Sequence, residues 1–218
     1  PVESGRFSWL HDKIQEGMYA LVPKQRKAKI SHHIGRLLQS KLSEDLLDEN
    51  IFLVVRLLNK GIKFIPTTDS TSRVMLAEIN LLAGKKSFHR SDFDHAVSYF
   101  SKGVALLPSN CWRVYDELTI ELYSYAGEAA YCVGQLFETE RFCKAILGRN
   151  NIPLLSKRRA YRTLIRGLNA KGSPELVTET CIELLGKLGC KIPNKLRTLR
   201  AIPTLLAAKS RVAQYTAS

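Results

Sequence analysis

Residues 83–108 decide the fold and read Ala-Gly-Lys-Lys-Ser-Phe-His-Arg-Ser-Asp-Phe-Asp-His-Ala-Val-Ser-Tyr-Phe-Ser-Lys-Gly-Val-Ala-Leu-Leu-Pro. A helix with the small residue Gly84 in its middle is followed by a turn at Ser91-Asp92. A second helix, closed by Pro108, carries a small residue, an aromatic and another small residue: Ala96, Phe100 and Gly103. Small residues allow two helices to approach closely, and the aromatic ring fills the groove between them. The stretch therefore predicts a pair of antiparallel helices.

The same order of helix, turn and helix recurs twice. A second copy has Gly127 in its first helix, a turn at Gly134, and Cys143 and Ile146 in its second helix. A third copy has its turn at Gly172 and then three apolar positions: Val177, Cys181 and Leu184. The turn positions 91, 134 and 172 are 43 and 38 residues apart, which is typical of helix-hairpin repeats. We predict an all-α, tetratricopeptide-like α-solenoid of about nine or ten helices, with an irregular helical bundle as the alternative.

Helical periodicity extends through the rest of the chain. Apolar or small residues at steps of three and four predict one helix across each of three segments: 47–62, 115–133 and 177–188. Ser173-Pro174-Glu175 is expected to begin the last of these helices. There Ser173 would accept a bond from a backbone amide, Pro174 needs no donor in the first turn, and Glu175 meets the positive helix end. Alternating patterns typical of strands are almost absent.

Composition excludes several protein classes. The chain has 218 residues, of which 45% are hydrophobic and 24% charged, so it is neither disordered nor collagen-like. The longest aliphatic or aromatic run is Ile51–Val55, far below the ~20 residues that span a bilayer. We therefore expect no membrane contact and a cytoplasmic location.

Cysteine usage agrees with an intracellular protein. No Cys-x-x-Cys pair occurs, and the five cysteines lie far apart: Cys111, Cys132, Cys143, Cys181 and Cys190. We expect reduced, mostly buried thiols. Zinc needs four convergent ligands, so no metal site is predicted.

Positive charge is concentrated in the C-terminal third. Residues 149–218 contain 14 Lys and Arg against 3 Asp and Glu, a net charge of +11, whereas residues 1–148 contain 19 against 17, a net charge of +2. The basic segment includes Lys157-Arg158-Arg159 with Tyr161 and Arg162, and further on Lys191, Lys195, Arg197 and Arg200. Such a face predicts nucleic-acid binding as the alternative function, and the other interpretation is a solvated face that complements an acidic surface elsewhere in a longer chain.

Two segments resemble chemical sites at first sight. Gly84-Lys85-Lys86-Ser87 is similar to the end of a phosphate-binding loop, but Ile79 stands where the first glycine is required and no strand precedes it. A second segment holds four possible metal ligands across a predicted turn, where we expect caps and solvated surface: His89, Asp92, Asp94 and His95. The adjacent His32 and His33 cannot both face one ion on a helix. We predict that the chain itself is not an enzyme and holds no cofactor.

Residues 7–19 carry a family resemblance and read Phe-Ser-Trp-Leu-His-Asp-Lys-Ile-Gln-Glu-Gly-Met-Tyr. The run resembles the sequence that follows the ATPase core in STAND proteins (signal-transduction ATPases with numerous domains), especially the large sensory kinases. The resemblance covers roughly residues 6–190 and continues through four further segments: 34–38, 58–61, 83–86 and 96–112. Gly17 and Met18 replace the usual Ala-Ala, and Ser31 stands where a His is common.

The resemblance implies a place in a longer protein, as does a chain that begins with Pro1. It implies a winged-helix or ATPase lid tail at 1–22, linking helices at 23–68, degenerate tetratricopeptide-like repeats at 69–190 and a basic helical segment or linker at 191–218. The chain would be a non-catalytic scaffold for protein–protein interaction and signal relay within an ATPase or multidomain sensor kinase that binds ATP and ADP.

The resemblance also implies one nucleotide contact. His11, next to Asp12, matches a Met-His-Asp motif in which the histidine contacts the β-phosphate of bound ADP. That contact could form only in the longer parent protein, since the chain has no phosphate-binding loop. In the alternative interpretation, His11 begins a helix and packs at a domain edge.

Overall fold

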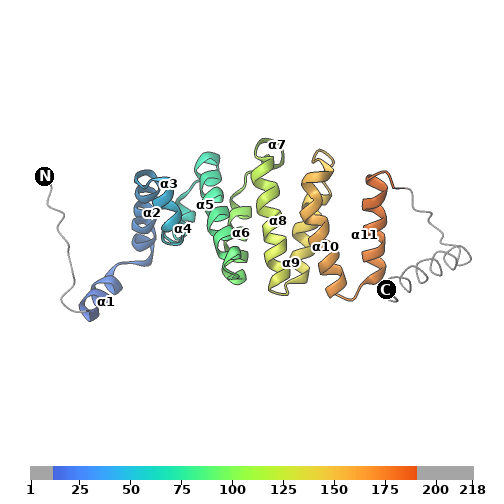
Figure 1. Cartoon of the computed structure of the whole chain (residues 1–218). Helices are drawn as coiled ribbons and strands as arrows, with labels where there is room; N and C mark the ends of the chain where they lie inside the picture. The colour runs from blue at the N-terminus through green and yellow to red at the C-terminus, as the bar shows by residue number, and fades with distance from the viewer. Residues whose placement is uncertain (1–11, 191–218) are drawn as a thin grey trace, which may run out of the picture. The chain divides into compact units, whose positions relative to one another are not determined.

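A computed structural model describes residues 12–190, and these residues form helices and no strands (Figure 1). The all-α prediction is therefore confirmed for the described part of the chain. Its α-helices are α1 (Asp12–Leu21), α2 (Lys24–Lys41), α3 (Glu44–Glu49), α4 (Ile51–Asn59), α5 (Ser70–His89), α6 (Phe93–Leu106), α7 (Cys111–Val114), α8 (Asp116–Cys132), α9 (Leu136–Leu147), α10 (Arg158–Ala170) and α11 (Pro174–Lys187). Two 3-10 helices lie between them, η1 (Ile62–Phe64) and η2 (Leu154–Lys157). The chain divides between Gly167 and Leu168 into two compact units.

Within the first unit, each long helix packs against the next one along the chain. α2 packs on α4, α4 on α5, α5 on α6, α6 on α8 and α8 on α9, and α5 also contacts α8. The core runs continuously through these contacts and centres on the fully buried Phe100, with Leu58, Leu122 and Phe142 among its largest members. The antiparallel pair predicted from residues 83–108 is thus present as α5 and α6.

Glycines lie where the helices of the first unit approach most closely. A Cβ atom at Gly84 of α5 would lie 2.4 Å from Cε1 of Phe100 on α6. A Cβ at Gly103 of α6 would lie 2.6 Å from Cδ2 of Leu122 on α8, and one at Gly127 of α8 would lie 3.1 Å from Sγ of Cys143 on α9. The small residues predicted to permit close approach therefore do so at three successive helix contacts.

The three predicted turns share one backbone geometry. Ser91, Gly134 and Gly172 have φ angles of 60°, 75° and 72°, in the left-handed region. In each case the following amide donates to the carbonyl five residues earlier, as Asp92 N to Ser87 O does at 2.9 Å. Each turn also has the shorter bond of a Schellman motif, which satisfies the last carbonyls of the helix before it. The positions of all three turns are confirmed.

Ser91 occupies a position that favours glycine. A side chain in the left-handed region crowds the carbonyl that follows it, at a cost of roughly 1–2 kcal/mol. We expect Ser91→Gly to raise the free energy of unfolding by about 1 kcal/mol in urea denaturation. Removing the crowded side chain stabilises the folded state by more than the greater backbone freedom of glycine stabilises the unfolded chain. The reverse change, Gly134→Ser, should lower it by a similar amount. Equal stability of both variants and the unaltered chain would contradict this reasoning.

Two local predictions are wrong. The stripe at 47–62 forms two helices instead of one, α3 and α4, because Asn50 interrupts them with φ −100° and ψ 13°. Its side-chain amide donates to the carbonyl oxygen of Leu46 at 2.9 Å, a bond that competes with helix continuation.

Ser173 does precede α11, and Pro174 is its first residue, but the Ser173 side chain makes no cap bond. Its backbone amide instead closes the preceding turn onto Leu168 O.

The cysteines are free, but they are less buried than predicted. Cys111 and Cys143 are buried and Cys181 is half-buried, whereas Cys132 and Cys190 are exposed. Both exposed residues lie at helix ends, where the chain turns away from the core: Cys132 is the last residue of α8 and Cys190 follows Gly189. The expectation of mostly buried thiols is therefore wrong for these two.

None of the helices in residues 12–190 combines the length and apolar character that crossing a bilayer requires.

Burial makes Cys143 unreactive. Removal from water, with a smaller effect from Glu128, raises the pKa of the Cys143 thiol to about 12. At pH 8 only about one such thiol in ten thousand is ionised, and the thiolate is the reactive form. We expect iodoacetamide to modify the exposed Cys132 in the native chain and to reach Cys143 only after unfolding in urea, as measured by mass spectrometry of tryptic peptides. Equal labelling of the two in the native state would be inconsistent with this packing.

Candidate protein-binding groove

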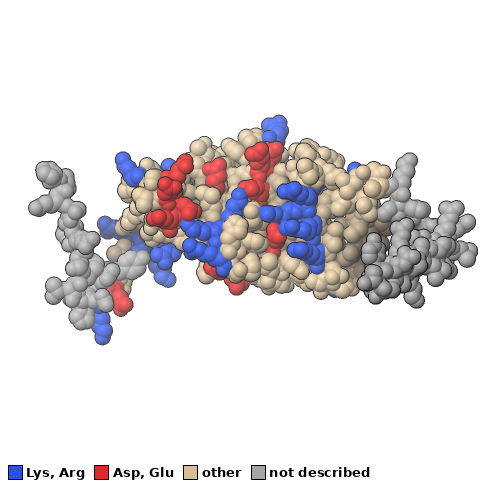
Figure 2. Space-filling view, viewed as in Figure 1, with Lys and Arg blue, Asp and Glu red and all other residues tan. Residues whose placement is uncertain are grey.

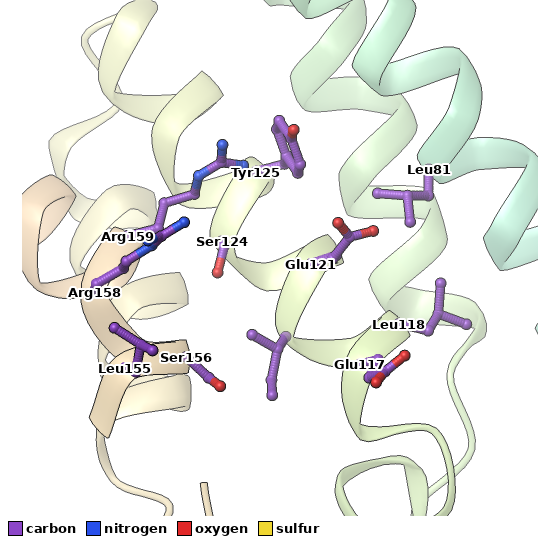
Figure 3. Close-up of a pocket in the computed structure, with 11 residues that line it drawn as sticks. Leu81, Glu117, Leu118, Glu121, Ser124, Tyr125, Leu155, Ser156, Arg158 and Arg159 are labelled. Atoms are coloured by element: carbon purple, nitrogen blue, oxygen red, sulfur yellow. The ribbon is translucent and has the colours of Figure 1, made fainter. Parts of the chain in front are cut away.

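A groove of about 780 Å³ crosses α8 between α5 and the start of α10 (Figure 3). Its lining comes from α5, α8, η2 and α10, and α6 and α9 contribute none of it. The lining residues are Leu81, Glu117, Leu118, Ile120, Glu121, Ser124, Tyr125, Leu155, Ser156, Arg158 and Arg159. α5, α8 and α10 each precede one of the three matching turns, so the groove is lined by η2 and the helices that lead into these turns.

The groove offers apolar surface. Leu81 reaches it from α5, and Leu118 and Ile120 reach it from α8. Leu155 of η2 lies on the opposite side and is 74% exposed, which is unusual for so large an aliphatic side chain. These side chains could receive an apolar anchor of a partner.

Arginines form the wall contributed by α10. The Arg159 guanidinium lies over the Tyr125 ring, 4.0 Å from its centroid, and its Nε is 3.4 Å from Glu128 Oε2. Arg162 pairs with the same carboxylate at 2.8 Å. Arg158 has no ion pair with any residue between 12 and 190. Glu128 and Tyr125 therefore hold two arginines in place, while the third is available to a carboxylate of a partner.

Carboxylates form part of the opposite wall. Glu117 and Glu121 come from successive turns of α8. Lys85 of α5 pairs with Glu121 at 2.7 Å, and its ammonium nitrogen lies 5.3 Å from the centroid of the Tyr125 ring. The groove thus has one side with arginines and one side with carboxylates, and apolar side chains lie on both. Such an arrangement selects the orientation of a bound segment as well as its charge.

The predicted basic face is only partly present. Arg158, Arg162 and Arg166 are exposed at i, i+4 and i+8 on α10, and Figure 2 shows basic side chains gathered over this helix. Lys157 is buried: its ammonium donates to Leu147 O at 3.2 Å and to Arg149 O, where it neutralises the end of α9. Tyr161 is also buried, 2% exposed. Including these two in the basic face was wrong, because both point into the core. The other four cations named in the predicted basic face lie outside the described residues: Lys191, Lys195, Arg197 and Arg200.

The sequence reasoning missed a second basic surface, on α2. This helix contains six Lys or Arg residues and no Asp or Glu. Summing charge over residues 1–148 hid this concentration, because acidic residues elsewhere in the segment cancel it. A charge count over single predicted helices would have found it.

The other predicted candidates are not brought together. The Nδ1 atom of His95 lies 2.9 Å from Asp92 Oδ1, and no group of three His, Cys, Asp or Glu side chains among the described residues could hold a metal ion. Asp92 precedes α6, but its carboxylate bonds His95 instead of a helix amide. His32 bonds Leu58 O at 3.3 Å, and His33 is exposed.

The two nucleotide candidates have different outcomes. Gly84-Lys85-Lys86-Ser87 lies inside α5, as the periodicity predicts, with Lys86 paired to Asp48 at 2.7 Å. A phosphate-binding loop would instead stand between a strand and a helix. His11 lies outside the described residues, so its predicted nucleotide contact in a parent protein stays a prediction.

The chain was compared with known proteins in three ways. The first is with models of protein families, the second with curated proteins and the third with solved structures. None of the family models, curated proteins or solved structures matches this chain.

Proposed function

We propose that this chain is a non-catalytic, tetratricopeptide-like scaffold that binds a segment of a partner protein in the groove of α5, α8 and α10. The observation that carries the proposal is that the lining of this groove comes from η2 and from the three helices that precede the matching turns, α5, α8 and α10. Stacked helix pairs create an extended binding surface from residues that recur at equivalent positions. The matching turns and the glycine contacts between successive helices support the same repeat.

We also propose that the scaffold relays a signal within a STAND-type ATPase or multidomain sensor kinase. The support is the resemblance of residues 7–19 and of the segments that follow. Helices packed in series pass a displacement from one to the next, because close-packed interfaces deform little. A phosphate-binding loop upstream of Pro1 in the longer protein would support this part of the proposal, and a different module there would oppose it.

Nucleic-acid binding is the second candidate, favoured by the exposed stripe of Arg158, Arg162 and Arg166 on α10. However, Arg162 already pairs with Glu128, and Lys157 points into the core. A nucleic-acid surface would neutralise phosphates with most of its cations, and its affinity would fall steeply with salt. The carboxylates of the groove oppose such a ligand and suit a peptide.

The proposal is tested with a displayed library of random 12-residue peptides, selected against the intact chain. Enriched peptides should bind with a measurable Kd in fluorescence anisotropy, and Arg158→Glu should weaken binding at least tenfold. Lys102→Glu is the matched control, because Lys102 is an exposed cation on α6, outside the groove lining. A lack of enrichment, or equal loss in both variants, would overturn the proposal. Binding of a 20-base-pair duplex that weakens steeply with salt would support nucleic acid instead.

A further inference from the structure

One face of α2 is already used in the core. Ser31 and Gly35 are buried, and a Cβ atom at Gly35 would lie 2.9 Å from Cγ of Leu58 on α4. The His32 ring lies close to Gly61, and its Nδ1 is 3.3 Å from Leu58 O. The contact with α4 therefore accounts for this side of the helix.

A second apolar stripe runs along α2, away from that contact. Ile30, Ile34 and Leu37 are at i, i+4 and i+7 and are 47%, 43% and 47% exposed. Single exposed apolar residues are ordinary, but three at this spacing form a continuous ridge on one side of a helix. This is the pattern by which one helix docks against another.

α2 carries six cations, and most of them have no acidic partner among residues 12–190. Four of them form no ion pair with a residue between 12 and 190: Lys24, Arg26, Lys29 and Lys41. Arg36 donates to the hydroxyl of Ser72 at 3.5 Å, and its charge helps to lower the pKa of Asp69. Some surface cations on other helices of the unit do have carboxylate partners, as Lys85 has Glu121 and Lys144 has Glu140. The surface of α2 is therefore complementary to negative charge that the described chain does not supply.

We propose that this surface of α2 binds an acidic amphipathic helix of a partner protein. Apolar side chains of the partner, spaced i, i+4 and i+7, would cover Ile30, Ile34 and Leu37. Asp and Glu residues beside them would pair with the cations of α2. The charge pairs contribute specificity and association rate, and the covered apolar area contributes most of the affinity.

Two features favour a protein helix over a lipid surface. α2 lies at one end of the packed helices of the first unit, and a terminal helix of a stack normally presents a polar outer face (Figure 1). An apolar ridge there indicates that a further helix continues the packing. In addition, α2 contains no aromatic residue, whereas helices that lie in a membrane interface use Trp, Phe and Leu over a broad apolar face.

The α2 surface is distinct from the groove, whose lining includes no residue of α2. Its test is therefore independent of the proposed function. A displayed library of random 16-residue sequences in a helix-stabilising framework is selected against the intact chain, and enriched peptides are synthesised with a photo-crosslinker. We expect these peptides to carry apolar residues at i, i+4 and i+7 flanked by Asp or Glu, and to crosslink within residues 24–41.

Variants give a quantitative readout in anisotropy titrations. Leu37→Glu should weaken binding at least tenfold, and Kd should rise as NaCl is increased because salt screens the charge pairs. Val114→Glu is the matched control, since Val114 on α7 is 49% exposed and should change Kd less than twofold. Crosslinking to the unaltered chain keeps the test decisive if Leu37→Glu unfolds.

Three results would overturn the inference. Enrichment of peptides without the acidic amphipathic pattern, or crosslinks outside residues 24–41, would remove the proposed partner. A dimer in sedimentation that Leu37→Glu dissociates would make a second copy the occupant. Co-sedimentation with phosphatidylglycerol vesicles, abolished by Leu37→Glu and without any enriched peptide, would assign the surface to a membrane.

Discussion

The Phe100→Ala variant is expected to lose about 3–5 kcal/mol of the free energy of unfolding, the usual cost of truncating a buried aromatic residue. Phe100 has no exposed surface, its ring contacts the Gly84 position of α5, and it stacks on Tyr125 of α8 at a centroid distance of 5.4 Å. The truncation would therefore leave a cavity where three helices meet. Because domains are stable by about 5–15 kcal/mol, this loss is a large part of the total. Urea denaturation followed by circular dichroism measures it.

Phe137→Ala is the matched control for this prediction. Phe137 lies on α9 and is 76% exposed, so the same chemical truncation removes almost no packing. We expect its free energy of unfolding to change by less than about 0.5 kcal/mol, as is usual for surface positions. Equal losses in the two variants would show that the Phe100 ring is not the centre of the core.

The Gly84→Ala variant is expected to lose about 1–3 kcal/mol, the range typical of overpacked cores. The new methyl group would lie 2.4–2.8 Å from three carbons of the Phe100 ring, closer than side chains tolerate. The ring cannot move away freely, because Tyr125 stacks on its face. The melting temperature and the urea midpoint both report this loss.

Gly186→Ala separates this clash from the general effect of alanine in a helix. Gly186 lies in α11 with nothing within 4 Å of its missing Cβ, so alanine there should stabilise the chain by about 0.5–1 kcal/mol. Adding Phe100→Leu to Gly84→Ala provides space for the methyl group. The double variant should therefore be more stable than the sum of the two single changes predicts. Strict additivity would mean that the two positions do not touch.

Much of the helical framework could be predicted because its determinants are local. Helices end near positions 91, 134 and 172, where the backbone is left-handed. These ends follow from short-range backbone chemistry, and each turn lies where the spacing of the helix pairs predicts it. Apolar periodicity likewise located the buried faces of α4 and α8. It failed at Asn50, where one side-chain bond to Leu46 O divides a continuous apolar stripe into two helices. Periodicity reports which face is buried and is insensitive to a single interruption.

The candidate sites could not be predicted to the same depth. Lys157 and Tyr161 belong to a basic run in the sequence, but both are buried, Lys157 at the end of η2 and Tyr161 in α10. The groove depends on Leu81, Tyr125 and Arg159, which are at least 34 residues apart in every pairing and meet only because the chain folds back on itself. No local pattern shows that Glu128 holds Arg159 and Arg162 while Arg158 meets no carboxylate within the described residues.

The sequence by itself determined that this chain is helical, where its repeat turns lie and which glycines stand at helix contacts. These properties depend on residues within a few turns of one another, so periodicity and turn chemistry are sufficient to find them. Only the tertiary structure decided which cations face solvent, which carboxylates they meet and which apolar residues of α2 stay uncovered. Those outcomes depend on the angle at which each helix packs, and that angle is set by contacts between residues far apart in the chain.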